Sequence, residues 1–421
     1  MTKGVMMAEF AFAEVDASEY FAPHRFMKSL IHQVVLLLAG LLFLTTVFAT
    51  LNTIVPLWLS HDSIPTWLIG MVSASFFVGN LAGTLLAGEM IPRMGYKTSF
   101  VISCLLCLGS TACLIPVGGL AGWMSVRFIA GISCALVWVV VESALLRLGT
   151  NSTRGGLLAA YMVVYYIATV LGQLLVTVLP DDRMRASLWI GAIGVASLLP
   201  IVVLRCGPAD PPRPFATIWA MLFRKRPRLS VLGSVISGIV LGSIYGLMPL
   251  FLVHKGMSNT WVGYWMALLI GAGIVGQWPF GRMADVKGRY YVLKLQSWLI
   301  IAACLLLALD VWLGVALVIL GCASFSLYPV TLTLGCDRLP KEYLVPMNQT
   351  LLLSFTVGSL AGPMGTSSMM EQFSDAMMPV CMAVMAGLYL MILIVHGRRQ
   401  GRPALPARFK GIWMKRRHGM P

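Results

Sequence analysis

Long apolar runs recur along the whole chain, separated by short polar stretches. Twelve of them are long enough to cross a membrane as an α-helix, which takes about 20 residues. They cover residues 35–59, 67–89, 98–117, 122–146, 156–179, 187–206, 230–253, 261–283, 290–309, 312–335, 348–371 and 376–396. Helices satisfy all their backbone hydrogen bonds internally, as lipid requires. The sequence therefore predicts an all-α membrane protein with twelve transmembrane helices.

The scarcity of charge supports the same conclusion. Charged residues make up 11% of the chain and apolar residues 58%, whereas about a quarter of a soluble domain is charged. The net charge of +15 would suit nucleic acid, but the basic residues lie in loops without interleaved aromatic residues, so we expect no nucleic-acid partner. Cys104 and Cys107 form a CxxC inside an apolar run. A metal or redox site needs an accessible loop, so we expect no metal and no cofactor.

The basic residues also indicate which loops face the cytoplasm. If the N-terminus is cytoplasmic, nearly all 31 Lys and Arg fall in cytoplasmic loops and tails. Only Arg183, Arg185 and Lys255 fall on the opposite side, and Arg127 lies within an apolar run. Membrane proteins concentrate Lys and Arg in cytoplasmic loops. The sequence therefore predicts a multi-pass protein of the bacterial inner membrane with both termini in the cytoplasm.

A polar, proline-rich stretch after the sixth run divides the chain into two halves. The predicted domains are a cytoplasmic N-terminal extension (1–33), a first six-helix bundle (34–206), a cytoplasmic central loop (207–229), a second six-helix bundle (230–396) and a basic cytoplasmic tail (397–421). The first 30 residues are either this extension or the product of a start codon placed too early. The basic tail is expected to lie against anionic lipid headgroups.

The two halves resemble each other at a fixed offset of 193 residues. Pro56-Leu57-Trp58-Leu59-Ser60-His61 matches Pro249-Leu250-Phe251-Leu252-Val253-His254. Four glycines of the first half, Gly70, Gly83, Gly88 and Gly95, match Gly263, Gly276, Gly281 and Gly288 without a gap. Such agreement indicates an internal duplication, which is one plan of secondary transporters. We expect Gly83 and Gly276 to let helices approach closely. Gly88 and Gly95 should bracket one tight turn, and Gly281 and Gly288 the matching turn of the second half.

Several segments resemble a known family. Gly88-Glu-Met-Ile-Pro-Arg93-Met-Gly95 and Gly281-Arg282-Met-Ala-Asp285-Val-Lys287-Gly288-Arg289 are similar to the loop motif of the major facilitator superfamily. Arg127-Phe-Ile-Ala-Gly131 is similar to its fourth-helix motif. Further stretches, including Trp138-Val-Val-Val-Glu142 and Gly276-Gln277-Trp278-Pro279, resemble the YcaD-like bacterial members. The resemblance covers nearly everything from about residue 30 to residue 397.

This resemblance implies a transporter of two six-helix bundles and points to residues that gate it. The gating-loop candidates are Gly88, Arg93, Gly95, Gly281, Asp285, Gly288 and Arg289. One departure is Pro92, which stands where the motif carries an Asp that helps to hold the cytoplasmic gate. Glu89 is a candidate substitute.

Two ionisable residues of the fourth run are the candidates for transport or proton coupling. Arg127 and Glu142 lie 15 residues apart, about 22 Å along a helix, too far for direct contact. They share one stripe of the helix with Gly131 and Trp138. Charges inside a membrane are rare and mark functional sites, and a carboxylate in apolar surroundings favours its protonated form. A structural cross-link for Arg127 and an interfacial, solvated position for Glu142 are the alternatives.

Other polar and aromatic residues at membrane depth are candidates to line the substrate cavity. These are Asn52, Trp138, Tyr245, Gln277 and Tyr328. Tyr245, Gln277 and Tyr328 are favoured; Tyr245 and Tyr328 lie on the seventh and tenth helices, which line the cavity in the resembled fold. Polar groups at this depth also bridge helices, and that role is the alternative for each.

The sequence thus predicts a secondary transporter that moves a small organic solute by alternating access, coupled to protons. A facilitated importer or uniporter is one alternative, and a non-transporting membrane sensor of the same fold is another. The chain lacks a Walker loop, an HExxH and a GxSxG, so we do not expect an enzyme. We expect a monomer, and the substrate cannot be named from the sequence.

Overall fold

In the computed structural model, residues 17–116, 118–148, 154–203, 228–337 and 341–400 are described. These residues form helices joined by short loops, with no strand among them. The first half comprises α1 (Ala17–His61), α2 (Thr66–Cys113), α3 (Gly119–Leu148), α4 (Arg154–Val176), α5 (Arg183–Ala196) and α6 (Leu198–Val203). The second half comprises α8 (Arg228–His254), α9 (Asn259–Lys287), α10 (Arg289–Ala308), α11 (Leu313–Cys336), α12 (Lys341–Gln372) and α13 (Met377–Gln400).

Ten segments of the described chain are long and apolar enough to cross a membrane. One of them is α2, which holds the predicted run 67–89 before Gly95 and the predicted run 98–117 as far as Cys113 after it. The predicted run 348–371 lies in α12, whose polar residues keep it out of the ten. The all-α membrane fold is therefore confirmed, while the count of twelve depends on dividing α2 and including α12.

The breaks at the two repeat-related loops have nearly the same backbone conformation. Gly95 has φ 81° and ψ 168°, and Gly288 has φ 88° and ψ 147°. Only glycine adopts this region at low cost, because it has no Cβ. The sequence predicted turns bracketed by two glycines, but Gly88 and Gly281 lie inside helices. Each turn is thus made by one glycine, 193 residues from its counterpart.

Close helix contacts within each half depend on repeat-related glycines, as the sequence predicted. A Cβ added to Gly83 of α2 would lie 2.5 Å from the carbonyl oxygen of Ile132 on α3. A Cβ added to Gly276 of α9 would lie 2.6 Å from the Cα of Cys322 on α11. Side chains at these positions would force the helices apart, so the sequence fixes how closely they pack.

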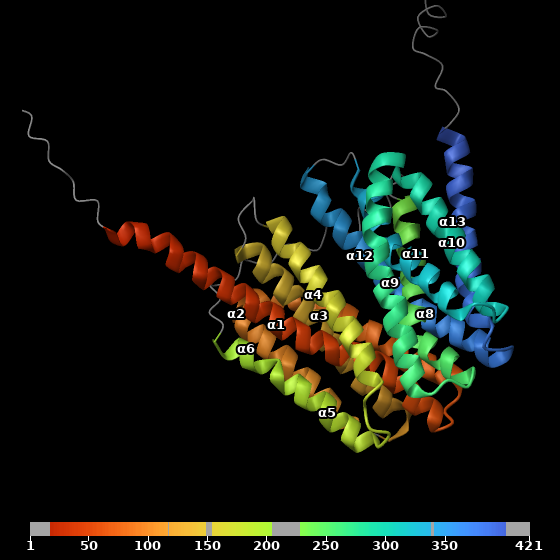
Figure 1. The fold of residues 1–421 in the computed structure, drawn as a ribbon, viewed down its shortest axis with the longest axis horizontal. Coiled ribbons are helices and arrows are strands. Elements are labelled where there is room, and N and C mark those ends of the chain that lie inside the picture. The colour runs from red at the N-terminus through yellow and green to blue at the C-terminus, as the bar shows by residue number, and fades with distance from the viewer. Residues whose placement is uncertain (1–16, 117, 149–153, 204–227, 338–340, 401–421) are drawn as a thin grey trace, which may run out of the picture.

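The two halves form a V in Figure 1. They lie against each other at its lower end, and we call the end that carries His61, His254 and Gln372 the closed end. Contacts between the halves run from α2 to α12, α4 to α9 and α1 to α8. Toward the top of Figure 1 the helices of the two halves diverge.

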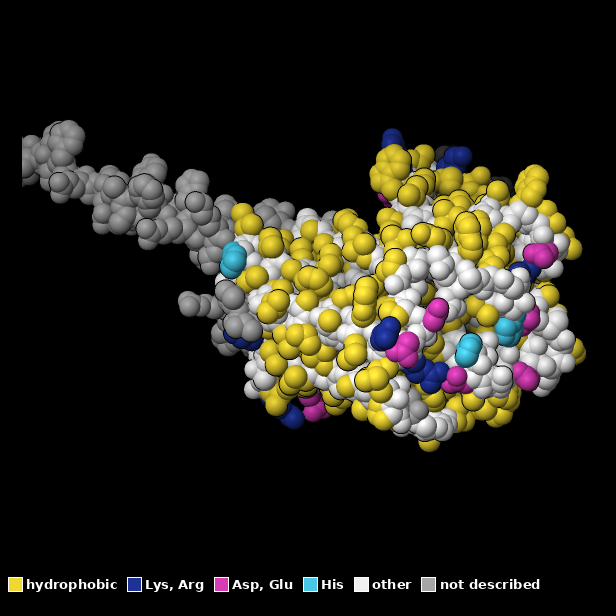
Figure 2. All heavy atoms as spheres, turned by 60° about the horizontal axis from the view of Figure 1, so that its bottom comes forward, with side chains coloured by type: hydrophobic (Ala, Val, Ile, Leu, Met, Phe, Trp, Pro, Cys, Tyr) yellow, Lys and Arg dark blue, Asp and Glu magenta, His cyan; other side chains and the backbone are white. Residues whose placement is uncertain are grey.

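The closed end carries much of the polar surface. Figure 2 turns this end forward and shows acidic, basic and histidine side chains gathered on it, with apolar side chains around them. Three ion pairs lie here: Arg183 with Asp62 at 2.6 Å, His254 with Asp375 at 2.8 Å, and Lys255 with Asp310 at 2.5 Å. This arrangement suits a boundary between lipid and water.

The predicted domain limits lie partly outside the described residues. The structure describes the helices up to Val203 and again from Arg228, so most of the predicted central loop at 207–229 falls between them. The predicted tail at 397–421 is described only to residue 400, and the extension at 1–33 only from residue 17. The five boundaries remain predictions.

Candidate functional site

A cluster of tyrosines joins the two halves at mid-length of the helices. Tyr165 and Tyr166 are consecutive on α4 and point about 100° apart, so they contact different neighbours. The side chains of Tyr165 and of Tyr245 on α8 lie close enough to interact. The side-chain amide of Gln277, on α9, donates to the Tyr166 hydroxyl. We call Tyr165, Tyr166, Tyr245 and Gln277 the tyrosine bridge, because α4 belongs to the first half and α8 and α9 to the second.

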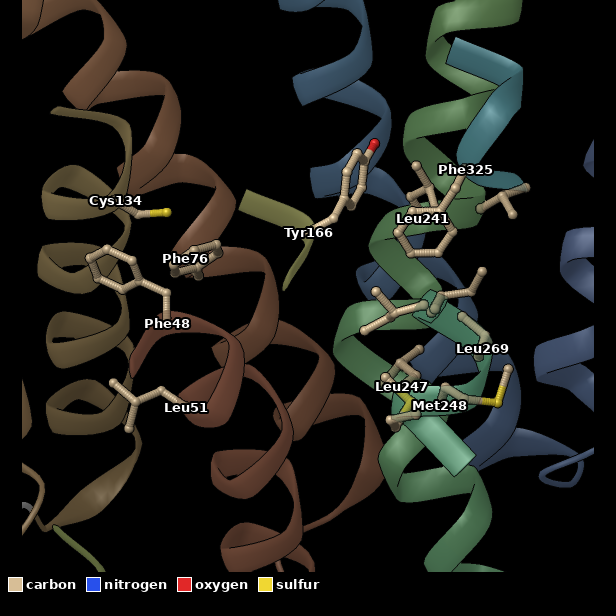
Figure 3. Close-up of a cluster of buried hydrophobic side chains, with 14 of the residues drawn as sticks. Phe48, Leu51, Phe76, Cys134, Tyr166, Leu241, Leu247, Met248, Leu269 and Phe325 are labelled. Atoms are coloured by element: carbon tan, nitrogen blue, oxygen red, sulfur yellow. The ribbon is translucent and has the colours of Figure 1, made fainter. Parts of the chain in front are cut away.

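Aromatic rings extend the tyrosine bridge into both halves. Trp138 of α3 meets Tyr165 edge to face, with ring centroids 5.3 Å apart, and Tyr165 meets Tyr166 at 5.2 Å. Tyr245 meets Phe325 of α11 at 5.8 Å. These are the separations that aromatic pairs prefer. Figure 3 shows Tyr166 between the helices of the first half and α8, with Phe325 beyond α8.

Glu142 lies on α3, one turn beyond Trp138, and is exposed. Its carboxylate is close enough to interact electrostatically with Tyr161 of α4 and with Tyr328 of α11. Tyr328 belongs to the second half, where its ring packs on Phe355 at 5.0 Å. Glu142 therefore lies within electrostatic range of the second half, on the side of the tyrosine bridge away from the closed end.

Arg127 lies in different surroundings, deep inside the first half. Its side chain is only 4% exposed. One guanidinium nitrogen donates to the amide oxygen of Asn52 on α1, and the cation lies 4.6 Å from the ring centroid of Phe76 on α2. The other two guanidinium nitrogens have no hydrogen-bond partner in the described part of the protein. Arg127 thus turns toward α1 and α2, and Glu142 is not among its contacts.

The gating-loop candidates lie near the break in α2 at Gly95 and at the junction of α9 and α10. Glu89 and Arg93 lie 3.4 Å apart on the exposed surface of α2, so this pair joins one turn of a single helix to the next. In the second half, Arg289 at the start of α10 pairs with Asp337 just after α11, which ties two helices together. Asp285 is exposed near the end of α9.

Comparisons with known proteins establish the family. A sequence model described as the Major Facilitator Superfamily matches residues 36–366. The chain belongs to the major facilitator superfamily. It is 47% identical over 381 residues to an MFS-type transporter of Enterobacter sp. (strain 638), covering 90% of this chain and 99% of that protein. It is 46% identical over 371 residues to the MFS-type transporter YcaD of Escherichia fergusonii, covering 88% and 97%.

Solved structures agree with a superfamily fold. The nucleoside transporter NupG superposes with a TM-score of 0.72 at 12% identity, covering 86% of this chain and 98% of that one. A bacterial homologue of the lysosomal transporter Spinster, in an inward-facing and occupied conformation, superposes with a TM-score of 0.67 at 14% identity, covering 87% and 96%. At these identities the likeness shows the fold alone. The predicted family and multi-pass membrane fold are thus confirmed.

Some residues that contact the candidate site residues were not singled out by sequence reasoning. Phe76 and Phe325 look like ordinary membrane phenylalanines in the sequence, and only the packing shows that one covers Arg127 and the other Tyr245. Tyr165 and Tyr166 carried a signal, because two adjacent hydroxyl groups inside an apolar run each need a partner. The roles predicted for Arg127, Glu142 and the cavity candidates remain predictions.

Proposed function

We propose that this protein is a secondary active transporter that moves a small organic solute across the bacterial inner membrane, coupled to protons. The observation that carries the proposal is the position of Glu142. Its carboxylate is exposed, lies on a membrane helix, and is close enough to Tyr328 of the opposite half to interact with it electrostatically. Carboxylates at membrane depth are rare, and they mark substrate or proton pathways.

Orientation follows from the basic loops, which put both termini in the cytoplasm. The closed end then faces the periplasm and the V opens toward the cytoplasm. The moving bodies in this proposal are residues 34–206 and 230–396, and the basic tail lies on anionic lipid. Alternating access would close the V around the tyrosine bridge and part the halves at His61 and His254.

Repeat-related glycines support this motion. A Cβ added to Gly70 of α2 would lie 2.8 Å from the carbonyl oxygen of Pro363 on α12. A Cβ added to Gly263 of α9 would lie 2.7 Å from the carbonyl oxygen of Gln173 on α4. Each half therefore packs its second helix closely against the fifth helix of the other half, with the small side chains of Ser367 and Thr177 at the two glycines. Two equivalent contacts of this kind suit two bodies that rock on each other.

Proton flux into liposomes that contain only this protein tests the proposal. A trapped pH dye would report flux on addition of each compound in a panel of metabolites and drugs, with nucleosides included because NupG shares the fold. We expect at least one compound to drive proton movement, and Glu142→Gln to reduce it to the level of protein-free vesicles. Asp181→Asn is the matched control, because Asp181 is an exposed carboxylate between α4 and α5.

Each other outcome has a definite meaning. Solute uptake without proton flux would replace coupling by facilitated transport. Coupled flux that survives in Glu142→Gln would remove Glu142 from the coupling role and leave transport in place. Binding of a compound without uptake would favour a sensor that retains the transporter fold.

A further inference from the structure

A lateral groove lies on the outside of the protein where the two halves meet. It has a volume of about 610 Å³. Its walls come from α2 and α3 of the first half and from α12 of the second. The lining residues are Met71, Ala74, Ser75, Val78, Met124, Ser125, Phe128, Ile129, Leu360 and Met364. The groove thus spans the boundary between the two bodies that the proposed function sets in motion.

The chemistry of the groove is apolar throughout. Its only polar side chains, Ser75 and Ser125, donate their hydroxyl groups to carbonyl oxygens of their own helices, at 2.7 and 2.8 Å. The walls therefore offer no free donor to a polar ligand. Three of the lining residues are methionines, whose unbranched side chains adapt to a flexible partner.

The depth of the groove identifies what surrounds it. On α2 its lining runs from Met71 to Val78, which is five to twelve residues from the start of the helix at Thr66. At 1.5 Å per residue this lies about 8–18 Å inside the membrane boundary. The hydrocarbon of one leaflet is about 15 Å thick. Val78, Ile129 and Met364 are exposed at this depth, so they face acyl chains rather than water or headgroups.

A polar contact closes the groove toward the boundary. The backbone N–H of Thr66 donates to Glu371 of α12 at 2.7 Å, and one turn further in, Gly70 packs against α12. On α2 the lining of the groove begins at Met71, the residue that follows Gly70. Its width is therefore set by the same α2–α12 contact that holds the closed end together.

We propose that an acyl chain of a phospholipid, from the leaflet at the closed end, binds in this groove and bridges the two halves. A chain seated there contacts α2, α3 and α12 together, so it stabilises the arrangement in which the closed end is closed. The proposal that the chain binds depends only on the groove. The proposal that binding favours the state with the closed end closed rests on the proposed function.

Photolabelling tests the binding step. The protein would be reconstituted in phosphatidylethanolamine and phosphatidylglycerol with a trace of phosphatidylcholine that carries a diazirine on its acyl chain. After irradiation, mass spectrometry would locate the label. We expect enrichment on the groove segments of all three helices, above the level on α13, whose Val384 and Met391 are comparably exposed.

Two variants fill the groove from opposite halves, so that the test can still be made if one of them fails to fold. Val78→Trp acts from α2 and Met364→Trp from α12, and each should reduce labelling of the opposite wall to the level on α13. Val384→Trp is the matched control, because it adds the same ring on a lipid-facing surface away from the groove. Labelling spread evenly over groove and α13, or unchanged in both filling variants, would overturn the binding step.

The effect on the two states has its own readout. If the seated chain stabilises the closed end, Val78→Trp should change the rate of solute-driven proton flux while Val384→Trp leaves it unchanged. Lost labelling with an unchanged rate would overturn the effect on the states and keep the binding site. If no compound gives flux at all, the proposed function fails while the labelling result stands on its own.

Discussion

At the residue scale, Arg127 is a cation enclosed in an apolar interior. Its described partners are the amide of Asn52 and the face of Phe76, and no carboxylate pairs with it among the residues that the structure describes. A buried charge without a counter-charge destabilises a fold, and apolar replacements of buried charges are often neutral or stabilising. An arginine kept for stability alone would thus be poorly placed here.

We therefore predict that Arg127→Met will leave the Tm in detergent unchanged or higher and will abolish solute-driven flux. The single variant leaves the Asn52 amide unpaired, which costs about 1–3 kcal/mol. The double variant Asn52→Leu with Arg127→Met removes that cost, and its Tm should equal or exceed that of the unmodified protein. A large fall in Tm in both variants would instead assign Arg127 a structural role.

The sequence indicated which individual residues are candidates for function, but it did not indicate which neighbours their side chains contact. Arg127 and Glu142 were identified as charges within an apolar run, because charged residues are costly and rare inside a membrane. The stripe argument placed both on one side of α3, yet Arg127 is buried against α1 and α2 while Glu142 is exposed and within electrostatic range of Tyr328 on α11. That difference depends on how three helices pack around α3, and helical periodicity alone does not predict this packing.

At the element scale, the two single-glycine turns show what the repeat specifies. Gly95 and Gly288 adopt positive φ, and this conformation costs other residues about 1–3 kcal/mol. Their repeat neighbours Gly88 and Gly281 lie inside helices, with no atom within 4 Å of an added Cβ. Glycine inside a helix is less favourable than alanine by about 0.5–1 kcal/mol.

The two glycines of each loop should therefore respond in opposite ways to the same substitution. We predict that Gly95→Ala will lower the Tm and that Gly88→Ala will leave it unchanged or raise it. Gly288→Ala and Gly281→Ala repeat the comparison in the second half. Thermal unfolding followed by intrinsic fluorescence measures all four. Equal effects at Gly88 and Gly95 would contradict a single-residue turn.

The elements themselves were largely predictable, because lipid imposes a minimum length and an apolar composition on every span. The exceptions have physical reasons. Nothing in the sequence distinguishes the turn-forming glycine from its helical neighbour, since both belong to the same motif. α12 falls below the apolarity of the other spans because it carries many small and polar residues, such as Ser354, Ser359 and Ser367, and these are buried against neighbouring helices.

At the scale of the whole molecule, the fold is two similar bodies joined at one end. The duplication predicted both the bodies and their equivalence, since the offset of 193 residues places Gly70 and Gly263 at matching contacts. The angle between the bodies was not predictable. It depends on contacts such as the tyrosine bridge, in which residues of different halves meet, and the sequence pattern does not show which of them pair.

If the halves rock on these two contacts, enlarging either glycine should part them at the closed end. An overpacked contact costs about 1–3 kcal/mol, and a cost paid in one state only shifts the populations about 5- to 150-fold. We predict that Gly70→Ala and Gly263→Ala will each lengthen the distance between labels at His61 and Asn259. The double variant should lengthen it further, because distant sites add.

Electron paramagnetic resonance would measure this distance, with spin labels attached through non-natural amino acids because the nine native cysteines would react with thiol labels. Gly109→Ala on α2 and Gly271→Ala on α9 are the matched controls, since an added Cβ meets no atom within 4 Å at either position. Both should leave the distance unchanged. A shift in only one of the two contact variants would mean that the halves pivot about one contact, and the symmetry of the repeat would then not extend to the motion.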